Sequence, residues 1–334
     1  MRSLSIKTVY EEISGLTGIP VEELNDTVSM LRRLPEIERE LEKRLVGQKE
    51  AVNTVVSALR ASLLRTHTSR PILSLLCVGP SGVGKTETAL QLARVCFGNP
   101  EALVRLDGSE YREPHSVARL IGSPPGYVGY GSGGYLTEAV RRRPRCVVLF
   151  DEVEKAAAEV VNLLLQVMDA ARLTDSTGQT VDFRRTMLVL TSNLGNTAVG
   201  VVPDRRSFER QIKSAVQQNL PPELLGRLDA VVVYHHLSFE ALKRIVQLKL
   251  EDLAGRIRGV SSFEVTQEAL EQLAREAYSP DKGGREVDRL LRRTIDLAVA
   301  QMLDSGALDP KIPSTVRIHY EDGDFLFENV TSPK

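Results

Sequence analysis

The sequence predicts an α/β protein: a large domain built on a parallel β-sheet wrapped by helices, followed by a small, mainly helical domain. From residue 72 onward, short runs rich in Leu and β-branched residues alternate with stretches of helical periodicity. Continuous apolar runs of this length are typical of strands buried on both faces, as in a parallel sheet. After Ser238 the periodicity becomes predominantly helical. The 334-residue length exceeds one ordinary compact domain and suits one large and one small domain.

Five strands are expected in the large domain, over residues 72–78, 103–107, 146–151, 186–192 and 230–234. Helices are expected before them at 3–14, 27–45 and 48–64; the second carries an amphipathic stripe of Leu31, Leu34, Ile37, Leu41 and Leu45. In the C-terminal part we expect helices at 239–258, 267–278 and 284–305, with short strands at 263–265, 315–320 and 325–328. The chain is therefore divided into a helical lead-in segment (1–45), a large α/β domain (46–236) and a small helical domain with short strands (237–330).

The composition argues against several classes of function. With 43 basic and 44 acidic residues and a formal net charge of −1, the chain has no bulk attraction to nucleic acid or an anionic membrane. No apolar run approaches the ~20 residues that a membrane span needs, and the N-terminus lacks the apolar stretch of a signal peptide. Cys77, Cys96 and Cys146 show no short spacing, and the five histidines show no ligand spacing, so neither a disulfide framework nor a zinc site is predicted. We expect a cytoplasmic protein.

The most specific motif is a glycine-rich loop between an apolar run and a helical run. It fits the P-loop pattern at every fixed position and reads Gly79-Pro80-Ser81-Gly82-Val83-Gly84-Lys85-Thr86. Glycines let the backbone turn so that several N–H groups face phosphate oxygens, and the N-terminus of the following helix adds partial positive charge. We expect Lys85 to contact the β- and γ-phosphates and the Thr86 hydroxyl to ligate Mg²⁺. A chance glycine-rich turn would lack this strand–loop–helix context.

Two further strand ends carry polar side chains that fit a nucleotide site. The apolar run 147–150 is followed by Asp151 and Glu152. In open α/β sheets, ligands bind at the carboxyl ends of strands. Asp151 is a candidate for the Mg²⁺ shell, and Glu152 for the general base that polarises an attacking water. Asn193 ends the next strand. From the residues alone, two roles for its side chain are about equally supported: orienting a water molecule near the γ-phosphate, or capping a turn. Together these residues predict ATP hydrolysis, with ATP and Mg²⁺ as cofactors.

Beyond these motifs, the sequence resembles the Clp family of AAA+ ATPases and is most similar to the second ATPase module of ClpB-type disaggregases. The likeness covers essentially the whole chain, and its most specific stretches are 119–143 (RLIGSPPGYVGYGSGGYLTEAVRRR), 151–155 (DEVEK) and 172–183 (RLTDSTGQTVDF). The resemblance implies an AAA+ domain with a five-stranded sheet of order 5-1-4-3-2 and a small helical lid. It also implies a homo-hexamer that binds ATP at subunit boundaries and threads polypeptide through a central pore.

Further site residues carry over from the family by motif. Asn193 matches the sensor that reads the γ-phosphate. Arg285, in the run 283–285 (GGR), matches the sensor arginine of the lid. Arg227, in the run 222–227 (PELLGR), matches the arginine finger, so the resemblance implies that it reaches the site of a neighbouring subunit.

The resemblance also assigns residues around the base and the pore. Ile19, in the run 17–20 (TGIP), and Val46 with Gly47 match segments that enclose the adenine. The pore loop of the family is matched by Gly126-Tyr127-Val128-Gly129. Residues 123–134 hold five glycines and two tyrosines, a composition too flexible for the interior of a helix or strand. Without the resemblance, a tyrosine folded back onto the core would be the favoured interpretation of Tyr127.

Several positions depart from the family pattern. Ala156 and Ala157 stand where the family usually has His-Pro, Ser132 where it has an acidic residue, Gly226 where it has Asn, and Leu16 where it has Trp. None of these touches the phosphate chemistry; they concern the pore and the subunit interface. The resemblance includes no N-terminal domain, first ATPase module or coiled-coil arm, so a fragment and a shorter relative are both compatible with the sequence.

Three functions follow, and the leading one is an ATP-driven unfoldase or disaggregase that acts on unfolded or aggregated proteins, with a co-chaperone as a possible partner. The second is an unfoldase that feeds a ClpP-type peptidase. Such proteins carry an Ile-Gly-Phe/Leu loop after the first sensor, whereas the run 199–201 (VGV) lacks the large apolar tip. The third is a nucleotide-switched assembly protein without threading, against which the nearly intact pore loop argues. Stimulation of ATP hydrolysis by unfolded protein separates the first function from the third.

Overall fold

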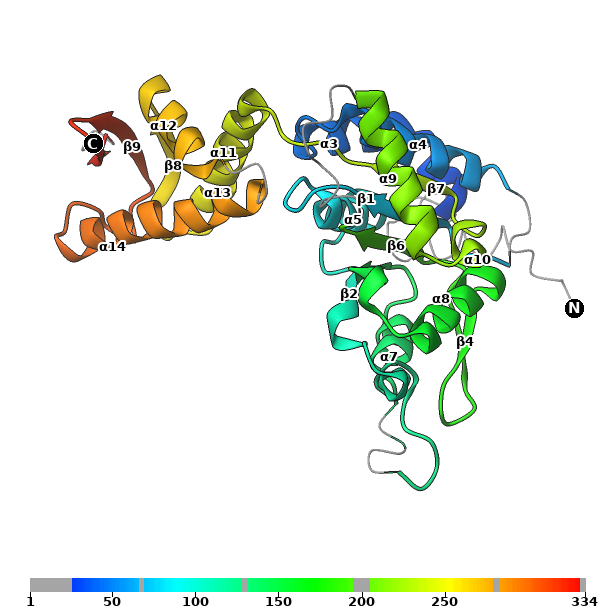
Figure 1. Cartoon of the computed structure of the whole chain (residues 1–334). Coiled ribbons are helices and arrows are strands. Elements are labelled where there is room, and N and C mark those ends of the chain that lie inside the picture. The colour runs from blue at the N-terminus through cyan, green and yellow to red at the C-terminus, as the bar shows by residue number, and fades with distance from the viewer. Residues whose placement is uncertain are drawn as a thin grey trace, which may run out of the picture.

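The computed structural model describes residues 26–65, 69–127, 131, 133–194, 205–278 and 283–330 of the chain. Figure 1 shows a large lobe around a central sheet and a smaller lobe of helices with its own sheet, joined by the segment that follows the last strand of the large lobe. The α/β class with a second, mainly helical domain is confirmed. The helix expected at 3–14 lies outside the described residues.

Five parallel strands form the central sheet in the order β2-β3-β6-β1-β7. They are β1 (Leu73–Val78), β2 (Leu103–Asp107), β3 (Val147–Asp151), β6 (Met187–Ser192) and β7 (Ala230–Val233). Counted within this sheet alone and read from the β7 edge, the order is 5-1-4-3-2; the labels differ because β4 and β5 form a separate hairpin. Every residue of β1, β3 and β6 is buried, as expected for strands covered on both faces.

Helices cover both faces of the sheet, and alternate residues of a strand contribute to two separate apolar clusters. Leu75 of β1 belongs to the cluster formed with α3 (Asp26–Arg44), α4 (Lys49–Leu63) and α5 (Lys85–Phe97). Leu76 belongs to the cluster on the other face, formed with α6 (Val117–Ile121), α7 (Tyr135–Arg142), α8 (Ala158–Ala170), α9 (Arg205–Asn219) and α10 (Pro222–Leu225). Short 3₁₀ turns span Gly108–Glu110, Pro114–Ser116 and Val153–Lys155.

Helix α3 has the amphipathic pattern expected of it. Leu34, Ile37 and Leu41 are buried in the cluster on the α5 side of the sheet, and Leu31 is partly buried at its edge. Pro35 lies within the helix with its ring exposed, where it removes a backbone hydrogen bond at a cost of about 3 kcal/mol. Burial of each large apolar side chain contributes about 1.5–3 kcal/mol, so the stripe outweighs the proline. The described part of the lead-in segment thus packs into the core of the large lobe.

A hairpin of β4 (Arg172–Thr174) and β5 (Thr180–Asp182) lies between α8 and β6, and no sequence pattern predicted it. Asp175 begins its turn. The next residue, Ser176, donates its N–H to the carbonyl oxygen of Ile121 at 2.9 Å. Because Ile121 is the last residue of α6, the hairpin is fixed to the point where the glycine-rich loop between α6 and α7 begins.

The small lobe packs helices against a three-stranded sheet of order β10-β9-β8. Its helices are α11 (Phe239–Ala254), α12 (Gln267–Ala277), α13 (Gly284–Leu291) and α14 (Leu297–Asp304). Its strands are β8 (Val260–Val265), β9 (Ser314–Glu321) and β10 (Asp324–Asn329). Helix α11 ends four residues before the expected position, because Gly255, a poor helix former, follows Ala254. The continuous helix expected at 284–305 contains a π-helical turn, Arg292–Asp296, between α13 and α14.

The small lobe has its own apolar cluster, distinct from the two clusters of the large lobe. Leu237 packs against the clusters of both lobes, which supports the proposed division after residue 236. Within the described ranges, no helix is both long and apolar enough to cross a bilayer. Cys77, Cys96 and Cys146 are buried free thiols.

Candidate functional site

The P-loop connects β1 to α5, and its conformation requires glycine. Gly79, Gly82 and Gly84 have positive φ angles of 147°, 72° and 109°. A Cβ atom on Gly79 would lie 2.4 Å from the backbone oxygen of Tyr234, so a larger residue would push the loop away from the adjoining strand end. The N-cap residue of the 13-residue helix α5 is Gly84, which has no side chain to cap the helix. Its first N–H groups are therefore available to an anionic ligand.

The side chain of Lys85 lies inside this loop and is 7% exposed. Its Nζ donates hydrogen bonds to the carbonyl oxygens of Gly79 and Pro80, both at 2.6 Å, and to Oδ1 of Asn193 at 2.9 Å. Burial lowers the pKa of Lys85 to about 8, and the positive charge of Arg285 lowers the pKa as well. A phosphate beside Nζ would favour the charged form again. An ammonium held by neutral acceptors in this way is suited to an anionic ligand.

Asp151 ends β3 and is 5% exposed. Its Oδ1 accepts a hydrogen bond from the hydroxyl of Thr191, and both carboxylate oxygens lie 3.3 Å from Oγ1 of Thr86. Its Oδ2 forms a 2.8 Å ion pair with Nη2 of Arg105 on β2. Hydroxyl and carboxylate oxygens are ligands that Mg²⁺ prefers, so Thr86 and Asp151 fit the metal expected of a P-loop site.

Asn193 links the lysine to the second carboxylate. While its Oδ1 accepts from Lys85, its Nδ2 donates to Oε1 of Glu152 at 2.7 Å. An ammonium only donates and a carboxylate only accepts, so these partners determine the orientation of the amide. The backbone N–H of Asn193 donates to Oε1 of Glu154 at 2.9 Å. Glu152 has a φ of 56°, a left-handed conformation that costs about 1–3 kcal/mol outside glycine and is typical of functional sites.

A cavity of about 400 Å³ lies between the P-loop and the small lobe. Its lining includes residues 82–86 with Asp151, Asn193 and Arg285. Its apolar lining comes from both lobes and includes Leu45, Val46, Ile245 and Leu248. A pocket lined by both charged groups and aliphatic side chains matches a ligand with a polyanionic part and an apolar, planar part.

The small lobe touches the P-loop directly. The N–H of Gly284 donates to the carbonyl oxygen of Gly82 at 2.8 Å, and Nη1 of Arg285 donates to Oγ of Ser81 at 3.2 Å. A Cβ atom on Gly283 would lie 2.7 Å from the oxygen of Gly82, so this close approach requires glycine. The residues at the start of α13 are therefore within reach of any ligand that the P-loop holds.

The structure brings together most of the site residues predicted from the sequence. Residues 79–86, Asp151, Glu152, Asn193, Arg285 and Val46 line the cavity or bond to residues that line it. Gly47 lies beside them, and a Cβ atom on it would lie 3.0 Å from Cβ of Ala241 in the small lobe.

Other predicted residues lie elsewhere. Arg227 is not among the cavity residues; its Nε lies 2.6 Å from Oδ1 of Asp169 on α8, although at an angle outside hydrogen-bond geometry. Gly126 and Tyr127 lie on the loop between α6 and α7, where Tyr127 is 71% exposed. The interpretation of Tyr127 as a core residue is therefore wrong. Ile19, Val128 and Gly129, together with the run 199–201, lie outside the described residues.

Sequence reasoning missed several residues of the site. Arg105, Thr191 and Glu154 contact Asp151 or Asn193, and the lid contributes Lys249 and Asp288, which form a 3.0 Å ion pair at the cavity. The one available signal for Arg105 was a charged residue inside the apolar run 103–107. No local pattern connects the lid residues with the P-loop.

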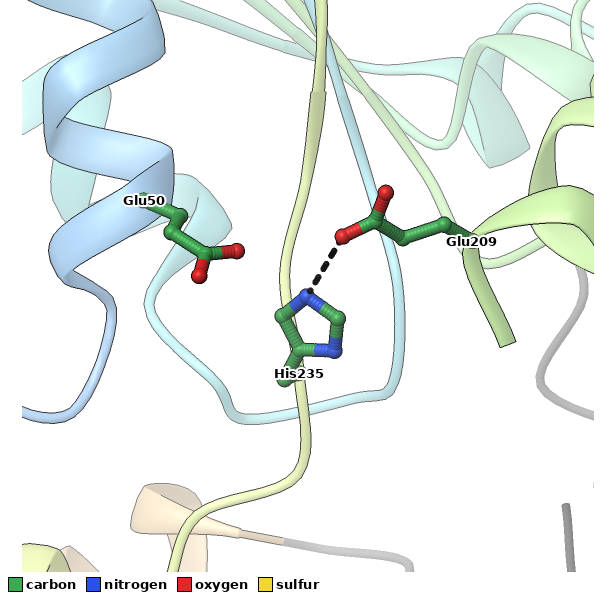
Figure 2. Close-up of side chains that lie close together, drawn as sticks. All are labelled: Glu50, Glu209 and His235. Carbon is green, nitrogen blue, oxygen red and sulfur yellow. Dashed lines mark ion pairs between the residues drawn. The ribbon is translucent and has the colours of Figure 1, made fainter. Parts of the chain in front are cut away.

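A second group of potential metal ligands lies away from the cavity. Oxygen and nitrogen atoms of Glu50, Glu209 and His235 lie within 4.8 Å of one another, and Figure 2 shows these side chains pointing toward a common centre. However, the guanidinium of Arg205 bridges the group: Nε donates to Nε2 of His235 at 3.1 Å, and Nη2 pairs with Glu50 at 2.8 Å. Because this cation already occupies Nε2 of His235 and the carboxylate of Glu50, we interpret the group as a charged junction between α4, α9 and the connection after β7.

Two family models match the chain in succession. Residues 70–231 match the AAA domain (Cdc48 subfamily), and residues 237–318 match the C-terminal, D2-small domain of ClpB protein. The second match begins within one residue of the division proposed between the lobes.

Curated proteins of two kinds are similar to the chain. It is 42% identical over 332 residues to the chaperone protein ClpB of Aquifex aeolicus, covering 96% of this chain and 32% of that protein. It is 43% identical over 307 residues to the ClpB of Vibrio vulnificus (90% and 36%). It is also 39% identical over 340 residues to the ATP-dependent Clp protease ATP-binding subunit ClpC of Staphylococcus aureus (98% and 41%). The chain thus spans only 32% to 41% of the length of these relatives.

Proposed function

Because the chain belongs to the Clp group of AAA ATPases, with an AAA domain followed by a ClpB-type D2-small domain, we propose that it is the ATPase module of a protein unfoldase or disaggregase. It hydrolyses ATP with Mg²⁺ and threads unfolded or aggregated polypeptide through the pore of a homo-hexameric ring. The observation that carries this proposal is the 71% exposure of Tyr127, on a glycine-rich loop of a lobe that also holds a complete P-loop site. The buried free cysteines fit a reducing, cytoplasmic compartment.

Several polar residues in and beside the cavity have a role in this chemistry. Lys85 and the N–H groups at the start of α5 bind the phosphates. Thr86 and Asp151 hold Mg²⁺, which supplies charge stabilisation for the transferred phosphoryl group. Glu152 accepts the proton of the attacking water, and Asn193, bonded to both Lys85 and Glu152, orients that water. The aliphatic residues Leu45, Val46, Ile245 and Leu248 surround the base.

Two arginines connect this site to motion and assembly. Arg285 reaches the P-loop from α13, so a phosphate bound there attracts the small lobe. Arg227 is paired with Asp169 on the α8 side of the large lobe, outside the cavity of its own subunit. That placement supports a role in the site of a neighbouring subunit, where an arginine finger stabilises the charge of the transition state.

Tyr127 supplies the contact with the substrate. The described part of its loop projects from the large lobe beyond α7 (Figure 1). An exposed aromatic ring offers a large apolar contact without reading the sequence of its partner, as a translocase requires. The hairpin of β4 and β5 holds the start of the loop through the hydrogen bond from Ser176 to Ile121, which supports a coupling between the large lobe and the loop.

The test is to replace Tyr127 and to measure unfolding of a tagged fluorescent reporter together with ATP hydrolysis. Tyr127→Ala should reduce the unfolding rate and the stimulation of hydrolysis by unfolded protein at least about tenfold more than basal hydrolysis, because the ring contributes grip and not chemistry. Tyr127→Phe should retain unfolding. Tyr135→Ala provides the matched control, since Tyr135 is also exposed (55%) but begins α7. Unfolding by Tyr127→Ala at the wild-type rate, in rings of normal size and thermal stability, would refute threading.

The similarity to ClpC favours one alternative, an unfoldase that supplies a peptidase. The ClpC relative is by name a subunit of a Clp protease, and its match covers 98% of this chain. Co-purification with a ClpP-type peptidase, and degradation of the reporter when that peptidase is added, would support the alternative. ATP hydrolysis that unfolded protein does not stimulate would instead favour an assembly protein without threading.

A further inference from the structure

Arg105 is a cation in the nucleotide cavity to which the proposed function gives no role. It occupies the middle of β2, the edge strand beside β3, and its side chain is 55% exposed. Its Nη2 lies 2.8 Å from Oδ2 of Asp151, and both residues line the cavity. Within the described residues, Asp151 forms one ion pair, and its partner is Arg105. Lys85 bonds to carbonyl and amide oxygens instead.

The carboxylate that Arg105 holds is the one assigned to Mg²⁺. Oδ1 of Asp151 accepts the hydroxyl of Thr191, which leaves Oδ2 as the oxygen best placed for a cation, and the guanidinium is bonded to it. Asp151 is 5% exposed, so charges around it are poorly screened by water and salt. A divalent ion on this carboxylate would be strongly repelled by a guanidinium 2.8 Å from the same oxygen. The two cations therefore compete for Asp151.

We propose that Arg105 makes this site selective for a divalent cation that arrives with a triphosphate, and that it rejects the free ion. A free divalent ion must displace the guanidinium of Arg105 from Asp151 and leaves it without an anionic partner. A triphosphate provides such a partner, because its oxygens accept the same planar, bidentate hydrogen bonds as a carboxylate. The half-exposed side chain of Arg105 can move from one acceptor to the other. Affinities for metal and nucleotide are then coupled positively through this residue.

This inference rests on the proposed nucleotide site, but it is tested without any measurement of hydrolysis or threading. Mn²⁺ alone, as a stand-in for Mg²⁺ at an oxygen site, is titrated into the intact chain and followed by electron paramagnetic resonance. Arg105→Gln should bind free Mn²⁺ at least about tenfold more tightly than wild type. Arg105→Lys, which keeps the charge, should stay close to wild type. Arg94→Gln is the matched control, because Arg94 is exposed in the last turn of α5.

Two further measurements make the test decisive. The gain in Mn²⁺ affinity must disappear when Arg105→Gln is combined with Asp151→Asn, since the competition requires that carboxylate. A non-hydrolysable ATP analogue should raise Mn²⁺ affinity more in wild type than in Arg105→Gln. Equal affinities of wild type and Arg105→Gln for free Mn²⁺, with matching thermal unfolding, would overturn the proposal, as would a gain that persists beside Asp151→Asn. If Arg105→Gln does not fold, free Mn²⁺ binding by Arg105→Met is compared in its place. If the chain bound no nucleotide, the proposed function would be refuted. The comparison of free Mn²⁺ binding by wild type and Arg105→Gln would still test the competition for Asp151.

Discussion

Single side chains of opposite charge are kept apart at the centre of the site. Lys85 donates to Oδ1 of Asn193, and the amide nitrogen of Asn193 donates to Glu152, so the ammonium and the carboxylate are bridged by a neutral group. Lys155 is the cation that pairs with Glu152. Lys85 is thus not neutralised by the carboxylate of Glu152 and keeps its charge for the phosphates, while Glu152 is paired with a lysine outside the P-loop. The two functions should therefore be separable by mutation.

We expect Lys85→Ala and Glu152→Gln to fail at different steps. Lys85→Ala removes the cation from the phosphate loop and should weaken ATP binding by at least about tenfold, or 1.4 kcal/mol. Glu152→Gln keeps the loop intact but cannot accept a proton from water, so it should bind ATP and lose roughly 10²–10⁴-fold in hydrolysis. Fluorescent-nucleotide titration measures the binding and phosphate release measures the rate. Glu159→Gln, on the exposed first turn of α8, should match wild type in both. Equal losses of ATP affinity in the two variants would contradict this separation.

The residues of the site that sequence could predict are those in contiguous motifs. Residues 79–86 and Asp151 are identified because a short pattern encodes both the local backbone and the chemistry. Asn193 was ambiguous, and the structure shows its amide between Lys85 and Glu152, although its sensing role stays a prediction. Arg105 was missed because an edge strand alternates buried and exposed residues, and a charge at an exposed position is usually solvated. Only the three-dimensional arrangement brings its guanidinium to Asp151.

Among the secondary-structure elements, the hairpin of β4 and β5 supports the loop that carries Tyr127. Its turn is held by Asp175, whose Oδ1 accepts hydrogen bonds from the N–H and hydroxyl of Thr177, while Oδ2 pairs with Arg141 of α7. Burial raises the pKa of Asp175, but these hydrogen bonds outweigh burial and leave the pKa at about 2. One carboxylate therefore connects the hairpin to the helix that ends the glycine-rich loop.

We expect Asp175→Asn to destabilise the large lobe by about 1–3 kcal/mol, since hydrogen bonds to a buried charged group are lost. Urea unfolding at neutral pH measures the change. Because the folded pKa lies below the ordinary value of 3.8, the unfolded chain takes up the proton first as the pH falls. The difference from wild type should be constant above about pH 5 and shrink as the pH falls from about 4 toward 2. Asp182→Asn, on the same hairpin but 51% exposed, should have little effect. A pH-independent difference would contradict the assigned role of the carboxylate.

Elements were predictable where their own residues carry a strong period. The five strands of the main sheet and the helices of the small lobe are confirmed to within a few residues. The hairpin was missed because three-residue strands, Arg172–Thr174 and Thr180–Asp182, are too short to show alternation, and their stability comes from Asp175 and α7. The π-helical turn at Arg292–Asp296 was missed because its residues continue the helical composition on both sides.

In the whole molecule, the nucleotide cavity lies where the two lobes meet. Nη1 of Arg44, at the end of α3, contacts both carboxylate oxygens of Asp252 on α11, at 2.7 and 2.8 Å. The backbone hydrogen bond from Gly284 to Gly82 is a second contact between the lobes, and its residues also line the cavity. A ligand between these contacts changes the energy of the lobe arrangement, because it binds groups of both lobes at once. Sequence could predict two domains but not this contact, since Arg44 and Asp252 are separated by 208 residues.

At the scale of the assembly, we predict that the ATP site of one subunit is completed by Arg227 of its neighbour. Arg227 faces Asp169 and not its own P-loop, so we expect it to act on the ATP of the neighbouring subunit. Arg227→Ala should then lower hydrolysis by roughly 10³–10⁵-fold, as for other arginine fingers. Asp169→Asn is the matched control, because it removes the ion pair but keeps the guanidinium, and it should retain most hydrolysis. Loss of activity in both variants would point to a structural role of the pair.

Mixed rings distinguish an arginine that acts between subunits from one that acts within its own. Arg227→Ala subunits keep Glu152, and Glu152→Gln subunits keep Arg227. Where the two kinds of subunit meet in the right order, the site at their boundary contains an intact Glu152 from one and an intact Arg227 from the other. In a ring of head-to-tail interfaces, random mixing in equal amounts makes about a quarter of the sites complete. ATP hydrolysis should therefore recover toward about one quarter of the wild-type rate when two inactive proteins are mixed and ring assembly is verified by sedimentation. An arginine that serves only its own subunit would give no recovery at any ratio. Mixed rings that remain inactive would thus exclude the assignment of Arg227 to the neighbouring site.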